Sequence, residues 1–358
     1  MEIGEQKEWY ISGAVITHRG KVYGHNEDSC LLEKVFSGEG MEEPKSVSSR
    51  VEGIFIGAVS DGIGGSAAGE VASRMVVDSL FGYKGETPED MVVHLESLND
   101  FIHSRGISDG IAGMGATVAG VCIGRAGPFA FNVGDARVYR QQDDYLMQVS
   151  KDDSIAQVLV DAGELGPEET RSKNLHQITQ ALGGSSDKKG IDPHMYPLKI
   201  GKEASFLICS DGLHDMVSLD DIESITAEST TPQEKVTSLY EAALRGGGED
   251  NISIIWIKVE AASLKRELSG KCLELKNKDG GKTAPLFFHD DQTLEFREKP
   301  YSYKVVGLEV FAGKGDVKIG FDSCKLSKGD KIVFRDGSGK VLKECAIVEI
   351  KSLADISR

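Results

Sequence analysis

No stretch of the 358-residue sequence approaches the ~18–20 consecutive apolar residues that a membrane-spanning helix needs. The first residues, MEIGEQKEWY, lack the basic start and the apolar core of a secretory signal. The chain has only six cysteines, and they form no CxxC pair and no zinc-finger spacing. We therefore expect a cytoplasmic protein with reduced, buried thiols and no membrane partner.

Basic residues do not outnumber acidic residues over most of the chain. Residues 261–358 hold 19 of the 41 Lys and Arg and 15 of the 57 Asp and Glu, so residues 1–260 carry a net charge of −20 and the remainder +4. Because nucleic-acid backbones are held mainly by Lys and Arg, this acidic balance argues against a nucleic-acid partner. It suits a cation-binding site, although a solvated acidic surface accounts for most of these carboxylates.

The sequence contains, in contrast, short apolar strands that begin or end on acids. The run Ile54–Val59 reads as a buried strand, and Asp61 and Gly62 follow it almost at once. Four such turns carry one or two carboxylates each, namely Glu27-Asp28, Asp61, Asp211 and Asp250. Close carboxylates repel one another unless they share a cation, and oxygen ligands suit Mg²⁺ or Mn²⁺ better than zinc. For any single turn, an incidental acid at a strand end is the alternative.

Hydrophobic periodicity predicts an α+β domain over residues 1–260. One helix follows the Asp61 turn, a second begins at Pro88, and a third spans Thr231–Arg245. Four short strands at hairpin spacing lie between Ala116 and Val149. The segment Ser37–Glu52 is polar and shows no periodicity, so we expect it to be a loop.

The remainder of the chain reads as a different kind of module. We expect a linker region over residues 261–282 and a small all-β domain, a sandwich or a barrel, over residues 283–358. No motif in this part indicates its role. It could dock on the acidic domain, bind a partner protein, or be an inert appendage.

Seven segments, in order, resemble the motifs of the metal-dependent serine/threonine protein phosphatases (the PPM or type 2C family) in their bacterial form. They are GKVYGHNED, AVSDGIGG, MGATVAG, NVGDARVYR, ITQALGG, ICSDGLHDM and GGGEDNISII. The resemblance runs from about Trp9 to Val259. It implies a four-layer α-β-β-α sandwich, with two antiparallel sheets flanked by helix pairs. It also implies hydrolysis of phosphoserine and phosphothreonine in proteins by a metal-bridging water, opposite a cognate Ser/Thr kinase.

The same resemblance implies a centre of two Mn²⁺ or Mg²⁺ ions. Asp61 is similar to the catalytic carboxylate that bridges the ions, and Gly62 to the residue whose carbonyl binds the second ion. The other implied ligands are two catalytic carboxylates that bind directly and two that act largely through metal-bound water: Asp211, Asp250, Glu27 and Asp28. For a third ion, which some members hold, Asp109 is the nearest acid to the expected position.

One position departs from the family pattern. Tyr23 stands where the family has an arginine that grips the substrate phosphate, and a phenol cannot make the bidentate contact of a guanidinium. Arg19, Lys21 and His25 of the same loop, with Tyr23 itself, are the candidate phosphate-binding residues. This departure keeps two other functions open: a regulatory or binding protein with weak turnover, and a hydrolase of small phosphate esters.

Three further residues in the motifs read as structural. We expect Arg137, with Asp135, to stabilise a hairpin, and His214 to contact Asp215. Asn251 is expected to hold the Asp250 turn.

Overall fold

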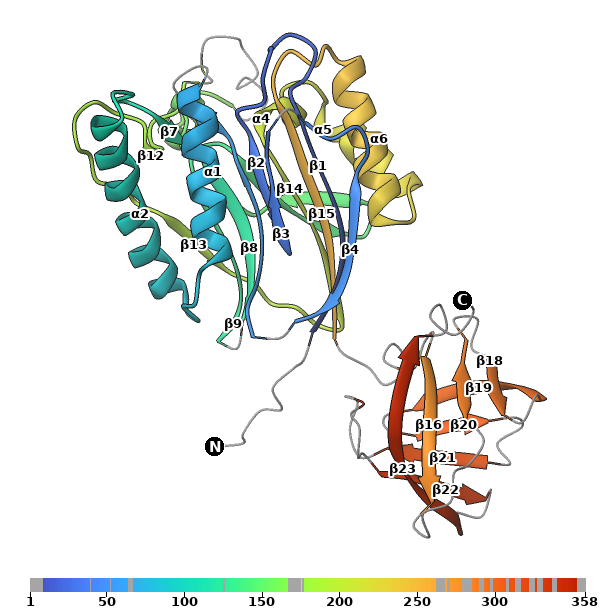
Figure 1. Cartoon of the computed structure of the whole chain (residues 1–358). Helices are drawn as coiled ribbons and strands as arrows, with labels where there is room; N and C mark the ends of the chain where they lie inside the picture. Colours follow the sequence, from blue (N-terminus) through green and yellow to red (C-terminus); the bar gives the residue numbers. More distant parts are fainter. Residues whose placement is uncertain are drawn as a thin grey trace. The chain divides into compact units, whose positions relative to one another are not determined.

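The computed structural model describes residues 9–261, apart from 39, 52, 64–66, 125, 167–174 and 176. Beyond residue 261 it describes 268, 271–277, 285–289, 293–296, 299–306, 309–312, 317–321, 326, 331–336 and 340–352. The chain divides into two compact units, Met1–Ala261 and Ala262–Arg358 (Figure 1).

Two antiparallel sheets of six strands form the centre of the first unit. One sheet has the order β11-β10-β14-β15-β1-β4 and the other β13-β9-β8-β5-β2-β3. The strands of the first sheet are β1 (Trp9–His18), β4 (Lys45–Arg50), β10 (Arg137–Gln142), β11 (Tyr145–Gln148), β14 (Glu203–Cys209) and β15 (Ile252–Ala261). Those of the second are β2 (Ser29–Leu32), β3 (Lys34–Phe36), β5 (Phe55–Ser60), β8 (Val118–Gly124), β9 (Gly127–Val133) and β13 (His194–Pro197). A small sheet, β12-β7-β6, joins β6 (Gly62–Ile63), β7 (Gly115–Ala116) and β12 (Leu182–Gly183).

Helices cover the outer faces of both large sheets (Figure 1). One pair is α1 (Ala67–Phe81) and α2 (Pro88–Ser108), and the other is α5 (Leu219–Glu228) and α6 (Pro232–Arg245). Two short helices, α3 (Ile155–Asp161) and α4 (Asp211–His214), complete the described helices. α2 and α6 each begin with a capping box and a proline in the first turn, which explains why their starts are legible in the sequence.

Three apolar clusters fill the three interfaces between these four layers. Val15, Val121 and Phe206 belong to the cluster between the two sheets. A second cluster lies under α1 and α2, and a third, which contains Trp256 and Leu239, lies under α6. The predicted four-layer α-β-β-α sandwich is therefore confirmed.

The segment Ser37–Glu52, expected to be a loop, contains strand β4, and that prediction is wrong. β4 (KSVSSR) pairs along one side with β1, from Tyr10 opposite Arg50 to Val15 opposite Lys45. It forms the edge of its sheet and leaves most of its side chains outside the core. An edge strand of this kind is held by backbone hydrogen bonds, so it needs no hydrophobic periodicity.

The second unit is a closed antiparallel barrel of eight strands. In chain order these are β16 (Lys271–Asn277), β17 (Leu286–Phe288), β18 (Thr293–Phe296), β19 (Lys299–Val306), β20 (Glu309–Ala312), β21 (Val317–Phe321), β22 (Lys331–Asp336) and β23 (Val341–Ser352). Closure comes from β16, which pairs with both β17 and β23. Part of the expected linker, 261–282, is therefore a barrel strand, because KCLELKN alternates apolar residues that enter the barrel core.

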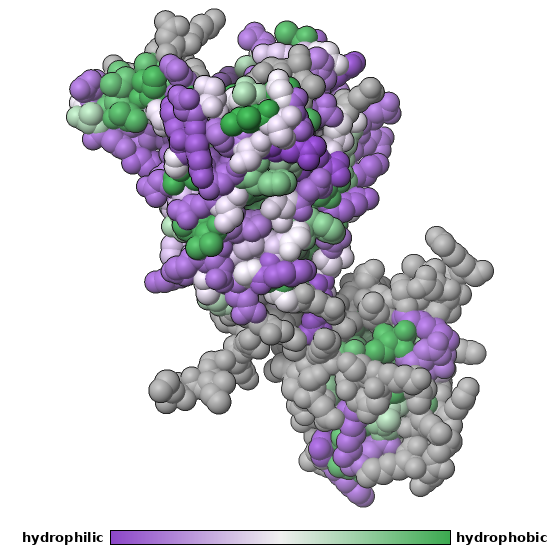
Figure 2. All heavy atoms as spheres, turned by 60° about the vertical axis from the view of Figure 1, so that its left-hand side comes forward, coloured by the Kyte–Doolittle hydropathy of each residue, from purple (hydrophilic) through white to green (hydrophobic). Residues whose placement is uncertain are grey.

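Among the described residues, no helix is both long and apolar enough to cross a membrane. On the face of the first unit shown in Figure 2, hydrophilic residues predominate and apolar residues form small, separate patches.

Candidate metal centre

Strand pairing brings the four acidic turns to one end of the sandwich. Cys209 of β14 lies opposite Ile254 of β15, so Asp211 and Asp250 stand at the same end of this strand pair. In the other sheet Ser29 lies opposite Ser60, which places Asp28 beside Asp61.

The carboxylates of these turns interact strongly with one another. Burial, followed by the negative charges of Asp28 and Asp211, raises the pKa of Asp61 well above its usual value. Burial likewise raises the pKa of Asp28 to about 7 and that of Asp211 well above the ordinary range. The pKa of Asp250 is raised, again chiefly by burial. Such a group of mutually repelling acids is costly unless cations or protons neutralise it.

Two buried oxygen atoms show that the group suits cations. Asp28 Oδ1 and Asp211 Oδ1 are buried and have no hydrogen-bond partner within the described part of the chain. A buried carboxylate oxygen without a donor carries a large desolvation penalty, which a divalent cation would offset. The residues present therefore fit the oxygen-rich donor set that Mg²⁺ and Mn²⁺ prefer.

The acids do not enclose an ion by themselves. Within the described ranges, no three His, Cys, Asp or Glu side chains converge in a way that could hold one metal ion. Backbone carbonyls and water would have to complete each coordination shell, as is usual for Mg²⁺. That Glu27 and Asp28 act largely through metal-bound water stays a prediction.

Glu27 is held from three sides. Its N–H donates to Asn251 Oδ1 at 2.7 Å, and its carbonyl accepts from Ser73 Oγ of α1 at 2.5 Å. A Cβ built on Gly69, also on α1, would collide with Glu27 Oε2. The first turns of α1 therefore shape the space in which the Glu27 carboxylate lies.

Gly62 packs against the same two segments, the start of α1 and the backbone of Glu27. A Cβ on Gly62 would collide with the Gly69 carbonyl and would come within 2.6 Å of the Glu27 carbonyl. The preceding Asp61 is held by Thr117, whose N–H donates to the Asp61 carbonyl at 2.8 Å. The last glycines of the AVSDGIGG motif, Gly64 and Gly65, lie outside the described residues.

Ser210 connects two of the acidic turns. Its hydroxyl donates to Asp28 Oδ2 at 2.9 Å and accepts from the N–H of Ser253 at 3.0 Å. Ser210 and Ser73 were not predicted from the sequence, because a serine beside an acid has no local signature that distinguishes it from other serines.

The loop between β1 and β2 places Tyr23 beside the acids. Tyr23 is 47% exposed, and the negative charge of Asp250, more than burial, raises its pKa. Asp211, Glu27 and Asp61 act on it in the same direction.

The cationic candidates of this loop are engaged with other groups. Arg19 Nη1 donates to the Gly24 carbonyl at 3.3 Å, and Lys21 Nζ to the Leu244 carbonyl at 2.7 Å. His25 Nε2 lies 4.0 Å from Glu27 Oε1. A phosphate-binding role for any of these residues stays a prediction.

Asp109 is the C-cap residue of α2. Its carboxylate accepts from Arg105 Nε at 2.5 Å and from Ser108 Oγ at 3.0 Å, and both partners lie on the same helix. Its role as a ligand of a third ion stays a prediction.

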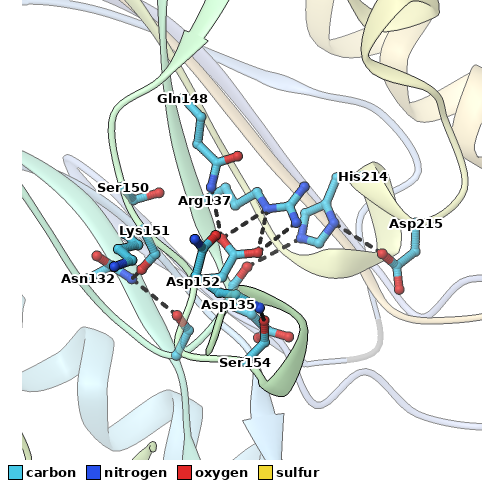
Figure 3. Close-up of polar contacts among 12 residues, drawn as sticks. Asn132, Asp135, Arg137, Gln148, Ser150, Lys151, Asp152, Ser154, His214 and Asp215 are labelled. Carbon is cyan, nitrogen blue, oxygen red and sulfur yellow. Dashed lines mark hydrogen bonds and ion pairs between the residues drawn. The ribbon is translucent and has the colours of Figure 1, made fainter. Parts of the chain in front are cut away.

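Arg137, Asp152 and His214 belong to a largely buried polar network (Figure 3). Arg137 contacts both carboxylate oxygens of Asp152, at 2.6–3.1 Å, and ties β10 to the segment after β11. His214 contacts Asp215 Oδ1 at 3.1 Å, as predicted, and the carbonyl of Asp135 at 3.3 Å. The pKa of Asp135 is raised to about 7, mainly by burial, and its charge in turn acts on Asp61 and Asp211.

Comparison with known families identifies the first unit. Residues 45–246 match the family model described as protein phosphatase 2C, which is more than half of the chain. The chain belongs to the protein phosphatase 2C family. The matched range contains Asp61 and Asp211, whereas Glu27, Asp28 and Asp250 lie outside it.

Two similar proteins from bacteria are named serine/threonine phosphatases. The chain is 32% identical over 228 residues to the serine/threonine protein phosphatase PstP of Mycobacterium tuberculosis (strain H37Rv), covering 61% of this chain and 43% of that protein. It therefore spans less than half of the length of this mycobacterial relative. The serine/threonine phosphatase stp of Listeria innocua is 28% identical over 263 residues, covering 71% of this chain and 98% of the relative.

Solved structures show the same fold. The crystal structure of the M. tuberculosis phosphatase PstP is 29% identical, with a TM-score of 0.56, and covers 69% of this chain and 98% of that one. A structure of the PstP catalytic domain with two manganese ions is 29% identical, with a TM-score of 0.55, and covers 70% of this chain and 99% of that one. These alignments leave about the length of the barrel unit uncovered.

Proposed function

We propose that the chain is a metal-dependent protein phosphatase that hydrolyses phosphoserine and phosphothreonine. The observation that carries this proposal is the meeting of Asp28, Asp61, Asp211 and Asp250 at one end of the sandwich, with two buried carboxylate oxygens left without a donor. A purely regulatory copy of the fold would have no need to bury so many repelling acids.

The proposed cofactors are two Mn²⁺ or Mg²⁺ ions, and the two manganese ions in a structure of the PstP catalytic domain support a centre of two divalent ions. Asp61 would bridge them, Gly62 would add its carbonyl, and Asp211 and Asp250 would bind directly. When bound, such ions supply a nucleophilic water at neutral pH and neutralise phosphoryl oxygens. A third ion at Asp109 has less support, because that carboxylate is already paired with Arg105.

The residues of the chain itself have separate tasks. Asp61, Asp211 and Asp250 provide the negative charge that collects the cations, and Ser210 and Ser73 fix the segments that carry Asp28 and Glu27. Tyr23, at the rim, replaces the arginine that the family uses to bind phosphate. Phosphate binding would therefore depend on the cations more than in other family members, and KM would be high.

The proposed setting is cytoplasmic, with a Ser/Thr kinase as counterpart and phosphorylated proteins as substrates. Two bacterial relatives named serine/threonine phosphatases support this substrate class. The barrel unit would select substrates or bind a partner protein.

The test is phosphate release from a phosphothreonine peptide and from p-nitrophenyl phosphate, with Mn²⁺ and with excess chelator. We expect Mn²⁺-dependent turnover of both substrates by the wild type and a loss of at least ~100-fold in kcat for Asp211→Asn. Asp187→Asn, in an exposed turn of the same unit, is the control and should retain wild-type turnover. No turnover of either substrate with any divalent metal would favour the regulatory alternative. Turnover of the small ester alone would favour the small-ester hydrolase.

A further inference from the structure

Asn251 lies between the segments that carry three of the four acidic turns. It is 5% exposed and directly follows Asp250, whose Oδ1 accepts from the Asn251 N–H at 2.7 Å. Its carbonyl faces the Asp211 turn, because a Cβ on Gly212 would collide with it. The hydroxyl of Ser210 lies 3.4 Å from the same carbonyl oxygen.

The side chain of Asn251 reaches the loop between β1 and β2, more than 220 residues away in sequence. Its Oδ1 accepts from the N–H of Glu27 at 2.7 Å, and its Nδ2 donates to the carbonyls of Arg19 and His25 at 3.0 and 3.1 Å. The amide thus uses its acceptor and both donors on one loop. A buried amide whose hydrogen bonds are all made to a single loop fixes the position of that loop.

The backbone of the same loop packs tightly on the turn before Asn251. The N–H of Lys21 donates to the Gly248 carbonyl at 2.7 Å. Gly20 has φ +73°, and a Cβ there would collide with the Asp250 carbonyl. By contrast, a Cβ on Gly24, in the same loop, would meet no atom within 4 Å.

We propose that Asn251 is the positioning residue that docks the β1–β2 loop, and with it Glu27 and Asp28, against the Asp211 and Asp250 turns. In this role Asn251 contacts neither ion nor substrate. Its position determines whether Glu27 and Asp28, the proposed water-mediated ligands, face the same cations as the direct ligands Asp211 and Asp250. The inference rests on the proposed function, because it assigns Glu27 and Asp28 to the metal centre.

The role expected from the sequence, holding the Asp250 turn, is therefore too narrow. The asparagine amide bonds to the distant loop, and the bond within its own turn comes from its backbone N–H.

Two independent substitutions of the full chain test this docking. Asn251→Ala removes the three side-chain hydrogen bonds, and Gly20→Ala displaces the same loop while Asn251 stays in place. Their controls are Asn99→Ala and Gly24→Ala. Asn99 is also a buried asparagine that bridges distant segments, since it accepts from the Gly183 N–H at 2.9 Å and donates to the Lys189 carbonyl at 2.9 Å.

The first measurement is hydrogen–deuterium exchange of the metal-free protein. We expect faster exchange over residues 19–28 in Asn251→Ala and Gly20→Ala, and wild-type exchange there in both controls. The second measurement is Mn²⁺ affinity by titration calorimetry. Loss of a residue that hydrogen-bonds to metal ligands weakens metal binding by about 10–100-fold. We expect a decrease of this size in Mn²⁺ affinity in Asn251→Ala and Gly20→Ala, and in neither control.

The outcomes separate the inference from the function on which it rests. Wild-type exchange over residues 19–28 and wild-type Mn²⁺ affinity in Asn251→Ala would overturn the inference while the function stands. Equal losses of Mn²⁺ affinity in Asn99→Ala and Asn251→Ala would also overturn it, because the effect would then be general destabilisation. If Asn251→Ala does not fold, Gly20→Ala against Gly24→Ala decides by the same two measurements. A wild type that binds neither Mn²⁺ nor Mg²⁺ would refute the proposed function itself.

Discussion

The carboxyl group of Asp28 is fully buried, and burial raises its pKa from 3.8 to about 7. Below about pH 7 its neutral form is therefore favoured in the folded, metal-free protein. Below pH 3.8 the group is protonated in both the folded and the unfolded state, so folding carries no penalty from it. As pH rises through about 7, the unfolded state has released its proton and the folded state must ionise a buried group.

We therefore predict that the free energy of unfolding of the metal-free protein falls as pH rises from 5 to 8. Asp28→Asn should remove about 1–3 kcal/mol of this fall. Urea unfolding in chelator at the two pH values measures the effect, and Mn²⁺ should restore more stability at pH 8 than at pH 5. A pH dependence that Asp28→Asn leaves unchanged would contradict the assignment.

Tyr23 leads to a prediction about substrate binding. Tyr23→Arg would place a guanidinium where the phenol now lies beside Asp250, within reach of a phosphate at the centre. We expect KM for a phosphopeptide to fall by about tenfold with a modest change in kcat, because a charge-assisted bidentate contact binds ground state and transition state alike.

The control for this change is Tyr145→Arg, which adds the same charge at a tyrosine that is 70% exposed on β11. An equal fall in KM for both variants would show a general effect of charge on an acidic protein. An unchanged or higher KM for Tyr23→Arg would show that position 23 does not face the phosphate.

The acidic residues of the centre are predictable from the sequence, whereas the residues that hold them in position are not. Asp61, Asp211 and Asp250 stand at the ends of apolar strands, a pattern that is visible in the sequence. Ser73 and Gly69 act on Glu27 only because α1 packs across the end of β2, and such a contact has no local signature.

The first turns of α1 provide a prediction at the scale of an element. Alanine normally stabilises a helix by up to ~1 kcal/mol relative to glycine. At Gly69 the added methyl group would collide with Glu27 Oε2 and the Gly62 backbone, so we expect Gly69→Ala to lower both the melting temperature and the Mn²⁺ affinity.

Gly82, just after the same helix, is the position of the control substitution for Gly69→Ala. A Cβ there would come no closer than 3.6 Å to any atom, and Gly82→Ala should leave both quantities near the wild-type values. Thermal unfolding with and without Mn²⁺ distinguishes the two. A Gly69→Ala variant more stable than the wild type would mean that Glu27 does not occupy this space.

Elements with a local signal were predicted well. α2 and α6 carry proline and capping boxes, and the inner strands β5, β8 and β15 are apolar and buried. β4 was missed because it is a polar edge strand that pairs through its backbone. β16 lies within the expected linker because its partner β23 is about 70–80 residues away, so that its place in a barrel depends on long-range pairing.

At the scale of the whole molecule, the two units have separate cores. The acids and their supports all lie within Met1–Ala261, whose chain closes on β15 paired with β1. We therefore predict that a chain ending at Ala261 folds and retains the kcat of the full chain for p-nitrophenyl phosphate.

A protein substrate is the informative comparison for the barrel. If the barrel selects substrates, truncation should raise KM for a phosphoprotein and leave KM for p-nitrophenyl phosphate unchanged. Loss of turnover of the small ester in a folded, truncated chain would show that the barrel contributes to the centre. The sequence predicts a small β module here but no function, because its motifs match no site that we can assign.

We propose that Asp61 joins the acidic turns into one centre that binds two cations. The most direct test is the Mn²⁺ stoichiometry of the full chain by titration calorimetry, for the wild type, Asp250→Asn and Asp61→Asn. If Asp61 bridges the ions, the wild type binds two, Asp250→Asn loses tight binding at one site, and Asp61→Asn loses it at both. Two tightly bound Mn²⁺ ions in folded Asp61→Asn would show that Asp61 does not bridge the ions.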